Sequence, residues 1–140
     1  MPSALPFFVY GTLLTGERNH ALFLAGRCAS VRPAVLDGAA LHAGPGFPYA
    51  VPDAAPGRRI VGELVTIRPA AYPAALAALD RLEDCQTDGG GEYVRERLTV
   101  RTGDGGTAPA WVYLAGAAVG ARLRAHPALI ASGDWRRRDR

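Results

Sequence analysis

The chain has 140 residues, of which 49% are hydrophobic and 21% are charged, so it has the size and composition of one globular domain, residues 1–140. No apolar run reaches the about 18 residues that a membrane-spanning helix needs, and the first residues lack the basic region of a signal peptide. All 16 basic residues are arginine, a preference typical of a GC-rich bacterial genome. We therefore expect a bacterial, cytoplasmic protein without a membrane partner.

The positive charge is concentrated at the C-terminus. The formal net charge is +3, but four arginines lie in the last five residues, and the rest of the chain is close to neutral. Nucleic-acid binding needs a basic face with stacking aromatic side chains, which the body of the sequence lacks. We therefore expect no nucleic-acid partner, and we interpret residues 136–140 as a disordered basic tail.

The N-terminal stretch PFFVYGTLLTG changes character at residue 11. Residues 6–10 form an apolar run typical of a buried strand, and Gly11 ends it. Glycine suits either a simple turn or a backbone that must approach another group closely. Local sequence leaves both interpretations open.

The next segments alternate between short elements and turns. Residues 21–25 favour a short helix, with Asn19 as its N-cap. Residues 28–43 read as one or two strands broken at Asp37 and Gly38. Residues 44–57 contain glycine and proline so often that we expect a loop.

The second half has the clearest pattern. A strand is expected over residues 60–67, followed by a helix from about Pro69 to Leu82 with leucines along one face. Residues 93–102 alternate as a strand, the DGG at 104–106 indicates a hairpin, and the returning strand follows it. Weak helical character returns at residues 119–124. The sum is an α+β domain with mostly strands and two or three helices.

The sequence lacks the common nucleophile and metal motifs. It has no GxSxG, HExxH or P-loop pattern. Its histidines, His20, His42 and His126, share no ligand spacing, so we expect no metal site. Cys28 and Cys85 form no CxxC pair and are expected to be reduced thiols.

Acidic residues gather where the clearest helix ends. Asp80, Glu83 and Asp84 face the negative end of the helix dipole, which is unfavourable. Glu83 follows Leu82 of the apolar face, and a carboxylate drawn into the core would have a raised pKa that suits proton transfer. A solvated helix end is the alternative interpretation.

Several stretches occur in a familiar order: FVYGTLLTGERNH, GFPYAVPD, IVGELVTI, LDRLED with EYVRERLTV, and AWVYLAG. Together they span about Phe7 to Gly116. In this order the chain resembles the gamma-glutamylcyclotransferase-like superfamily, and the AIG2-like group in particular. The resemblance implies an α+β fold built as a small mixed β-barrel with flanking helices.

The resemblance also implies site residues. The glutamate that matches the family's catalytic acid/base is Glu83. The YGTL loop would hold the substrate through backbone groups, and a tyrosine on a late strand would line the pocket. The implied substrate-binding residues are Tyr10, Gly11, Thr12, Leu13 and Tyr113.

The implied reaction is cyclisation of a gamma-glutamyl amide to 5-oxoproline with release of an amine, an activity of the transferase or lyase type. The substrate's own amino group is the nucleophile, so the reaction calls for no cofactor or metal. Asp84 stands where many relatives have glycine, and a second carboxylate beside Glu83 would make the site more anionic. The amine half of the substrate and the oligomeric state stay open. The alternative is a non-catalytic domain of the same fold that binds or senses a small ligand.

Overall fold

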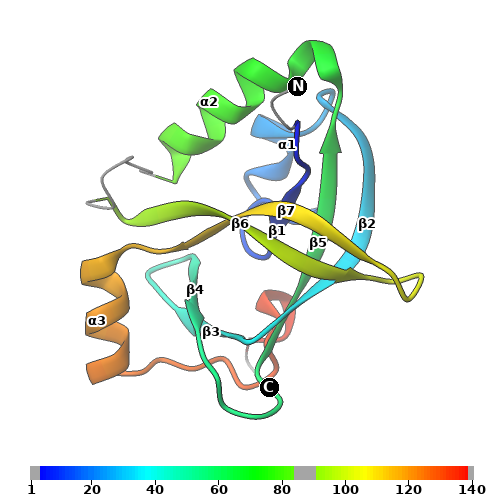
Figure 1. Cartoon of the computed structure of the whole chain (residues 1–140). Helices are drawn as coiled ribbons and strands as arrows, with labels where there is room; N and C mark the ends of the chain where they lie inside the picture. The colour runs from blue at the N-terminus through cyan, green and yellow to red at the C-terminus, as the bar shows by residue number, and fades with distance from the viewer. Residues whose placement is uncertain (1–3, 84–90, 139–140) are drawn as a thin grey trace.

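The computed structural model describes residues 4–83 and 91–138, and it contains a closed five-stranded barrel in the order β1-β5-β2-β6-β7 with a separate β3–β4 pair (Figure 1). The strands are β1 (Phe7–Val9), β2 (Cys28–Asp37), β3 (Ala39–Ala43), β4 (Pro48–Pro52), β5 (Arg59–Ile67), β6 (Tyr93–Thr102) and β7 (Thr107–Ala115). The helices are α1 (His20–Phe23), α2 (Tyr72–Leu82) and α3 (Ala117–Ala125), with 3-10 turns η1 (Pro69–Ala71) and η2 (Trp135–Arg137). The predicted α+β fold with a small barrel and flanking helices is confirmed.

The short strand β1 closes the barrel. It pairs antiparallel with β5, where Phe8 faces Leu64, and parallel with β7, where Phe8 faces Val112. All three β1 residues are buried, as a strand with neighbours on both edges requires. Because the pairing with β7 is parallel, the carboxyl ends of β1 and β7 meet at the same end of the barrel.

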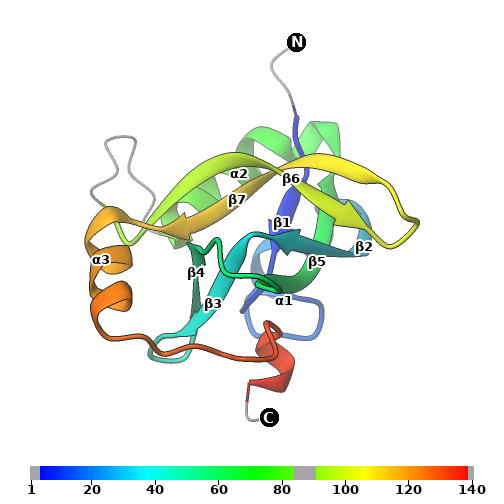
Figure 2. The ribbon, with the colours of Figure 1, turned by 60° about the horizontal axis from the view of Figure 1, so that its bottom comes forward.

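The helix α2 covers one side of the barrel, while the β3–β4 pair and α3 lie toward the other side (Figures 1 and 2). Ala75 and Leu79 of α2 are fully buried, and Leu76 and Leu82 pack against the core cluster. The predicted helix from Pro69 to Leu82 is therefore confirmed, with a 3-10 turn at its start. Among the described helices, none is long and apolar enough to cross a membrane.

The prediction of a loop over residues 44–57 is wrong at its centre, where Pro48–Pro52 form β4. Its two prolines stand at the ends of the strand, opposite Ala43 and Ala39 of β3, where a missing N–H costs least. Tyr49, Ala50 and Val51 between them are buried. The strand depends on pairing with β3, which the local composition cannot reveal.

Asn19 occupies the N-cap position of α1, but its side chain makes no capping hydrogen bond, so the predicted capping role is wrong. The Asn19 amide instead donates to the Thr12 hydroxyl at 2.8 Å, and the Asn19 N–H donates to the Thr12 carbonyl at 2.9 Å. These two bonds fasten the turn after β1 to the start of α1.

Residues 136–138, within the expected tail, make contacts with the domain. Arg138 stacks on the buried Trp135 ring at 4.1 Å, and the Arg136 guanidinium donates to the Thr15 carbonyl. Arg136 also lies 3.8 Å from the Glu63 carboxylate, which accepts hydrogen bonds from the Thr15 N–H at 2.8 Å and hydroxyl at 3.0 Å. The C-terminal turn thus supports the segment that follows β1.

We predict that Arg136→Ala lowers the free energy of unfolding by about 0.5–1.5 kcal/mol, because it removes a charge-assisted hydrogen bond and an ion pair at a partly buried carboxylate. Urea unfolding followed by circular dichroism measures the change. Arg137→Ala is the control: the exposed Arg137 side chain lies 3.7 Å from Asp134 but donates no hydrogen bond to a described residue, so its loss should cost less than about 0.5 kcal/mol. Equal losses in the two variants would contradict the supporting role of Arg136.

Candidate active site

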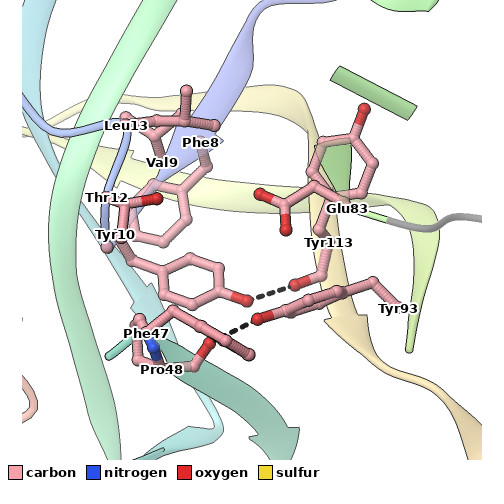
Figure 3. A pocket seen from close by; sticks show the side chains of 11 residues that line it. Phe8, Val9, Tyr10, Thr12, Leu13, Phe47, Pro48, Glu83, Tyr93 and Tyr113 are labelled. Atoms are coloured by element: carbon pink, nitrogen blue, oxygen red, sulfur yellow. Dashed lines mark hydrogen bonds between the residues drawn. The ribbon is translucent and has the colours of Figure 1, made fainter. Parts of the chain in front are cut away.

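A pocket opens at the end of the barrel where β1 and β7 finish (Figure 3). The predicted site residues come from three places in the chain: the end of β1 with the turn after it, the end of α2, and β7. The structure brings all of them to the lining of this pocket. They are Tyr10, Gly11, Thr12, Leu13, Glu83 and Tyr113.

Glu83 ends α2, and its backbone N–H donates to the Leu79 carbonyl at 2.9 Å. Its carboxyl group points into the pocket toward Tyr10 and Thr12 (Figure 3). No described residue donates a hydrogen bond or a positive charge to that carboxyl group. Burial, which favours the neutral form, therefore raises the pKa of Glu83 to about 7.

Tyr10, Tyr93 and Tyr113 surround the Glu83 carboxyl group, and their hydroxyls donate hydrogen bonds to other acceptors. Tyr10 donates to the backbone carbonyl of Tyr113, and Tyr93 donates to the carbonyl of Pro48 at 2.7 Å (Figure 3). Burial raises the pKa of all three tyrosines, and the charge of Glu83 adds to this. They remain neutral at physiological pH, which leaves Glu83 as the lining group suited to exchange a proton.

The Tyr113 hydroxyl faces away from the pocket centre and donates to Asp80 at 2.6 Å. Asp80 also binds Arg95 through two hydrogen bonds of 2.9 and 3.3 Å, and Arg95 stacks on Trp111 at 4.3 Å. This network fixes α2 against β6 and β7. Tyr113 therefore lines the pocket with its ring and carbonyl, whereas Asp80 holds α2 in place through its bonds to Arg95 and Tyr113. Asp84 lies outside the described residues.

Gly11 is where the backbone comes close to another group. A Cβ atom at this position would lie 2.6 Å from Cδ and 2.7 Å from Cγ of Pro48 in β4, nearer than real contacts allow. The close approach that the sequence left open is thus first of all an approach to the Pro48 ring. It places the turn after β1 directly against the pocket wall formed by β4.

The turn of residues 11–13 has its carbonyl groups occupied. The Gly11 carbonyl accepts from the Leu14 N–H at 3.0 Å, and the Leu13 carbonyl lies 3.0 Å from Nδ1 of His20. The N–H groups of residues 11–13, in contrast, have no acceptor within the part of the chain that the structure describes. These three residues all line the pocket.

Sequence reasoning missed five residues of the pocket lining: Phe8, Val9, Phe47, Pro48 and Tyr93. Two signals could have indicated them. Phe47 and Pro48 belong to the GFPY stretch and Tyr93 begins the YVRERL strand, both of which contributed to the family resemblance. Their burial against the site depends on pairings between distant strands.

The remaining candidates make structural contacts. His42 is buried, accepts a hydrogen bond from the Ala128 N–H at 3.2 Å, and has a pKa lowered by burial. Cys28 donates to the Leu24 carbonyl at 3.0 Å, and Cys85 lies outside the described residues. Over residues 4–83 and 91–138, no group of three or more histidine, cysteine, aspartate or glutamate side chains could hold a metal ion.

This small closed barrel with flanking helices is the fold of solved gamma-glutamylcyclotransferase-like structures, to which the chain is similar. The family model described as "Gamma-glutamyl cyclotransferase, AIG2-like" matches residues 7–137, so the chain belongs to that family. A comparison with curated proteins finds no match.

Solved structures agree with this assignment. YkqA from Bacillus subtilis is 27% identical with a TM-score of 0.65; the match covers 94% of this chain but 39% of YkqA. An AIG2-like protein from Mus musculus is also 27% identical, with a TM-score of 0.61 and coverage of 79% and 76% of the two chains. A protein named gamma-glutamyl cyclotransferase shares the fold at 24% identity and a TM-score of 0.56, with coverage of 79% of this chain and 66% of its own.

We predict that Gly11→Ala destabilises the protein by about 1–3 kcal/mol, because the rigid Pro48 ring must move to admit the methyl group. The free energy of unfolding in urea tests this. Gly103→Ala is the control: nothing lies nearer than the Pro33 carbonyl at 4.0 Å, so the change should stay within about 0.5 kcal/mol. A neutral Gly11→Ala would show that the contact with Pro48 does not constrain the turn.

The raised pKa of Glu83 predicts how stability depends on pH. The folded protein keeps the Glu83 proton up to about pH 7, whereas the unfolded chain releases it near the ordinary value of 4.5. Wild type should therefore lose stability relative to Glu83→Gln as pH rises between these values. The total is on the order of 3 kcal/mol, because the two pKa values differ by about 2.5 and each unit corresponds to about 1.4 kcal/mol.

Urea unfolding of the two proteins at pH 4 and pH 8 measures this difference. The difference between the two free energies of unfolding at each pH cancels the titration of all groups that the proteins share. A gap between wild type and Glu83→Gln that is the same at both pH values would contradict a raised Glu83 pKa.

Proposed function

We propose that this protein cyclises a gamma-glutamyl amide to 5-oxoproline and releases the amine, with Glu83 as general acid/base. The observation that carries the proposal is the Glu83 carboxyl group, whose pKa is raised to about 7 inside a pocket that it shares with the turn of residues 10–13. A group with this pKa can both accept and return a proton near neutral pH.

The reaction needs one proton to be moved. The substrate's α-amino nitrogen attacks its own side-chain amide carbon, a C–N bond forms, and Glu83 takes the proton that the nitrogen loses. Glu83 then donates that proton to the amide nitrogen, the old C–N bond breaks, and the amine leaves. Since the nucleophile belongs to the substrate, the protein's task is to hold the two reacting groups together.

The carbonyl oxygen gains negative charge during the attack. The N–H groups of residues 11–13, which have no acceptor among the described residues, are suited to stabilise it. The neighbouring tyrosines have neutral, already bonded hydroxyls, so they shape the pocket and exclude water without competing for the proton. Because water is excluded from the pocket, the effective dielectric constant is low and these electrostatic interactions are stronger.

Glu83→Gln tests the proposal, because glutamine keeps the shape of the side chain but cannot accept a proton. Release of 5-oxoproline should fall by about 10²–10⁴-fold, which corresponds to about 3–5 kcal/mol in the barrier. The assay measures 5-oxoproline from a panel of gamma-glutamyl amino acids and gamma-glutamyl amines. Circular dichroism should show that the variant is folded.

Tyr113→Phe is the matched control, because it removes a hydroxyl that points to Asp80 while it keeps the ring and the carbonyl in the pocket. Its activity should fall far less than that of Glu83→Gln. A loss of the same size would transfer the central role to Tyr113. If wild type binds gamma-glutamyl compounds but releases no 5-oxoproline, the domain is the non-catalytic ligand-binding alternative.

A further inference from the structure

A separate hollow lies where the β3–β4 pair meets the end of α3, and it shares no lining residue with the candidate active site. Its walls come from β3, β4, the segment after β4, the end of α3 and the chain that follows α3. That chain runs from α3 back past β3 toward η2 (Figure 2). The hollow has an open volume of about 780 Å³, which is in the range of small-molecule sites.

His42 of β3 is the buried polar side chain in the wall of this hollow, and it is 7% exposed. The chain after α3 is bonded to β3 on either side of it. The Ala43 N–H donates to the Ala128 carbonyl at 2.8 Å, and the Ile130 N–H donates to the Leu41 carbonyl at 2.8 Å. The Ala128 N–H in turn donates to Nδ1 of the His42 ring at 3.2 Å, which fixes the orientation of the ring.

The bond from Ala128 decides which nitrogen of the His42 ring carries the proton. Burial lowers the pKa of His42, so the ring is neutral at physiological pH. Because Nδ1 accepts a hydrogen bond, the proton of the neutral ring is on Nε2. This N–H has no acceptor among the described residues. Within the same residues, Nη1 of Arg27 is the one side-chain nitrogen or oxygen that is both fully buried and unpartnered, so Nε2 of His42 is open to the hollow that the ring lines.

Two arginines also line the hollow. Arg58 donates from Nε to the Asp53 carboxylate at 3.1 Å, and Asp53 also accepts from the Ala55 N–H at 2.9 Å. The charges of Arg58 and Asp53 therefore offset each other. Arg124, near the end of α3, has no hydrogen-bond or ion-pair partner among the described residues. The hollow thus has one uncompensated positive charge at Arg124 and one unpartnered N–H donor at His42.

Apolar side chains supply the remaining wall. Val51 and Leu123 are buried, and Pro127 lies beside them in the lining. Leu129 also lines the hollow and is 39% exposed, although it is a large hydrophobic residue. A hydrocarbon group packed against these side chains would gain about 0.8 kcal/mol for each CH₂ removed from water.

We propose that this hollow is a second binding site, which takes a small organic monocarboxylate. The carboxylate accepts hydrogen bonds from the Arg124 guanidinium and from Nε2 of His42. Its hydrocarbon part packs against Leu123 and Leu129. A planar guanidinium matches a carboxylate through two parallel hydrogen bonds. A single negative charge balances the one uncompensated arginine, whereas a dianion such as phosphate would be repelled by the nearby Asp53.

Hexanoate is the probe that tests the proposal, and NMR titration of the isotope-labelled full chain measures its binding. Hexanoate should bind at least about 10-fold more tightly than hexan-1-ol, which lacks the charge, and than acetate, which lacks the chain. Inorganic phosphate should bind more weakly than hexanoate. The Nε2–H signal of His42 and the backbone N–H signals of Arg124 and Leu129 should shift as hexanoate is added.

Arg124→Gln should weaken hexanoate binding by about 10-fold and leave hexan-1-ol binding unchanged, because it removes the charge and keeps the apolar wall. Arg97→Gln is the matched control: it removes the same charge from an exposed position on β6 outside the hollow, so hexanoate binding should persist.

Three results would overturn the carboxylate site. The first is hexanoate binding that leaves the His42, Arg124 and Leu129 signals in place, or no binding at all. The second is binding of hexan-1-ol, acetate or phosphate that is as tight as that of hexanoate. The third is an equal effect of Arg124→Gln and Arg97→Gln. None of these results bears on the proposed reaction, since the hollow contains no residue of the candidate active site.

Discussion

Closure of the barrel through β1 is the constraint on which the site depends. The strand β1 pairs parallel with β7, so the carboxyl ends of these two strands lie at the same end of the barrel. Because β7 pairs antiparallel with β6, the start of β6 lies at that end too. The turn after β1, Tyr113 and Tyr93 meet there for that reason. The helix α2 ends at the same place, so Glu83 completes the pocket.

Among the described residues, Glu83 is the one ionisable side chain of the pocket lining that has no hydrogen-bond partner. The buried tyrosine hydroxyls of the pocket are satisfied by two backbone carbonyls and by Asp80, as buried polar groups usually are. The Glu83 carboxyl group has no donor among the described residues, and its ionisation is therefore unfavourable. Burial of Glu83 therefore lowers the stability of the folded state near neutral pH. The same burial gives the carboxyl group a pKa of about 7, which suits proton transfer.

The sequence predicted the elements whose signal is local. The helix ending at Leu82 follows from its leucine spacing, and the hairpin at 104–106 follows from its turn residues. The strand β4 was missed because its two prolines suggested a loop, while the pairing with β3 that allows them lies in distant residues. The resemblance to a family identified Glu83 and the turn at Gly11, but the Phe47 and Tyr93 walls arise from tertiary packing, which no single segment encodes.

The pH dependence of kcat/KM for 5-oxoproline release tests most directly whether Glu83 exchanges the proton. The ionised carboxylate must accept the first proton, so kcat/KM should rise with pH through an apparent pKa of about 7. The residual activity of Glu83→Gln should lack this step. A wild-type profile that is already flat at pH 5.5, or a step near pH 7 that persists in Glu83→Gln, would contradict the assignment.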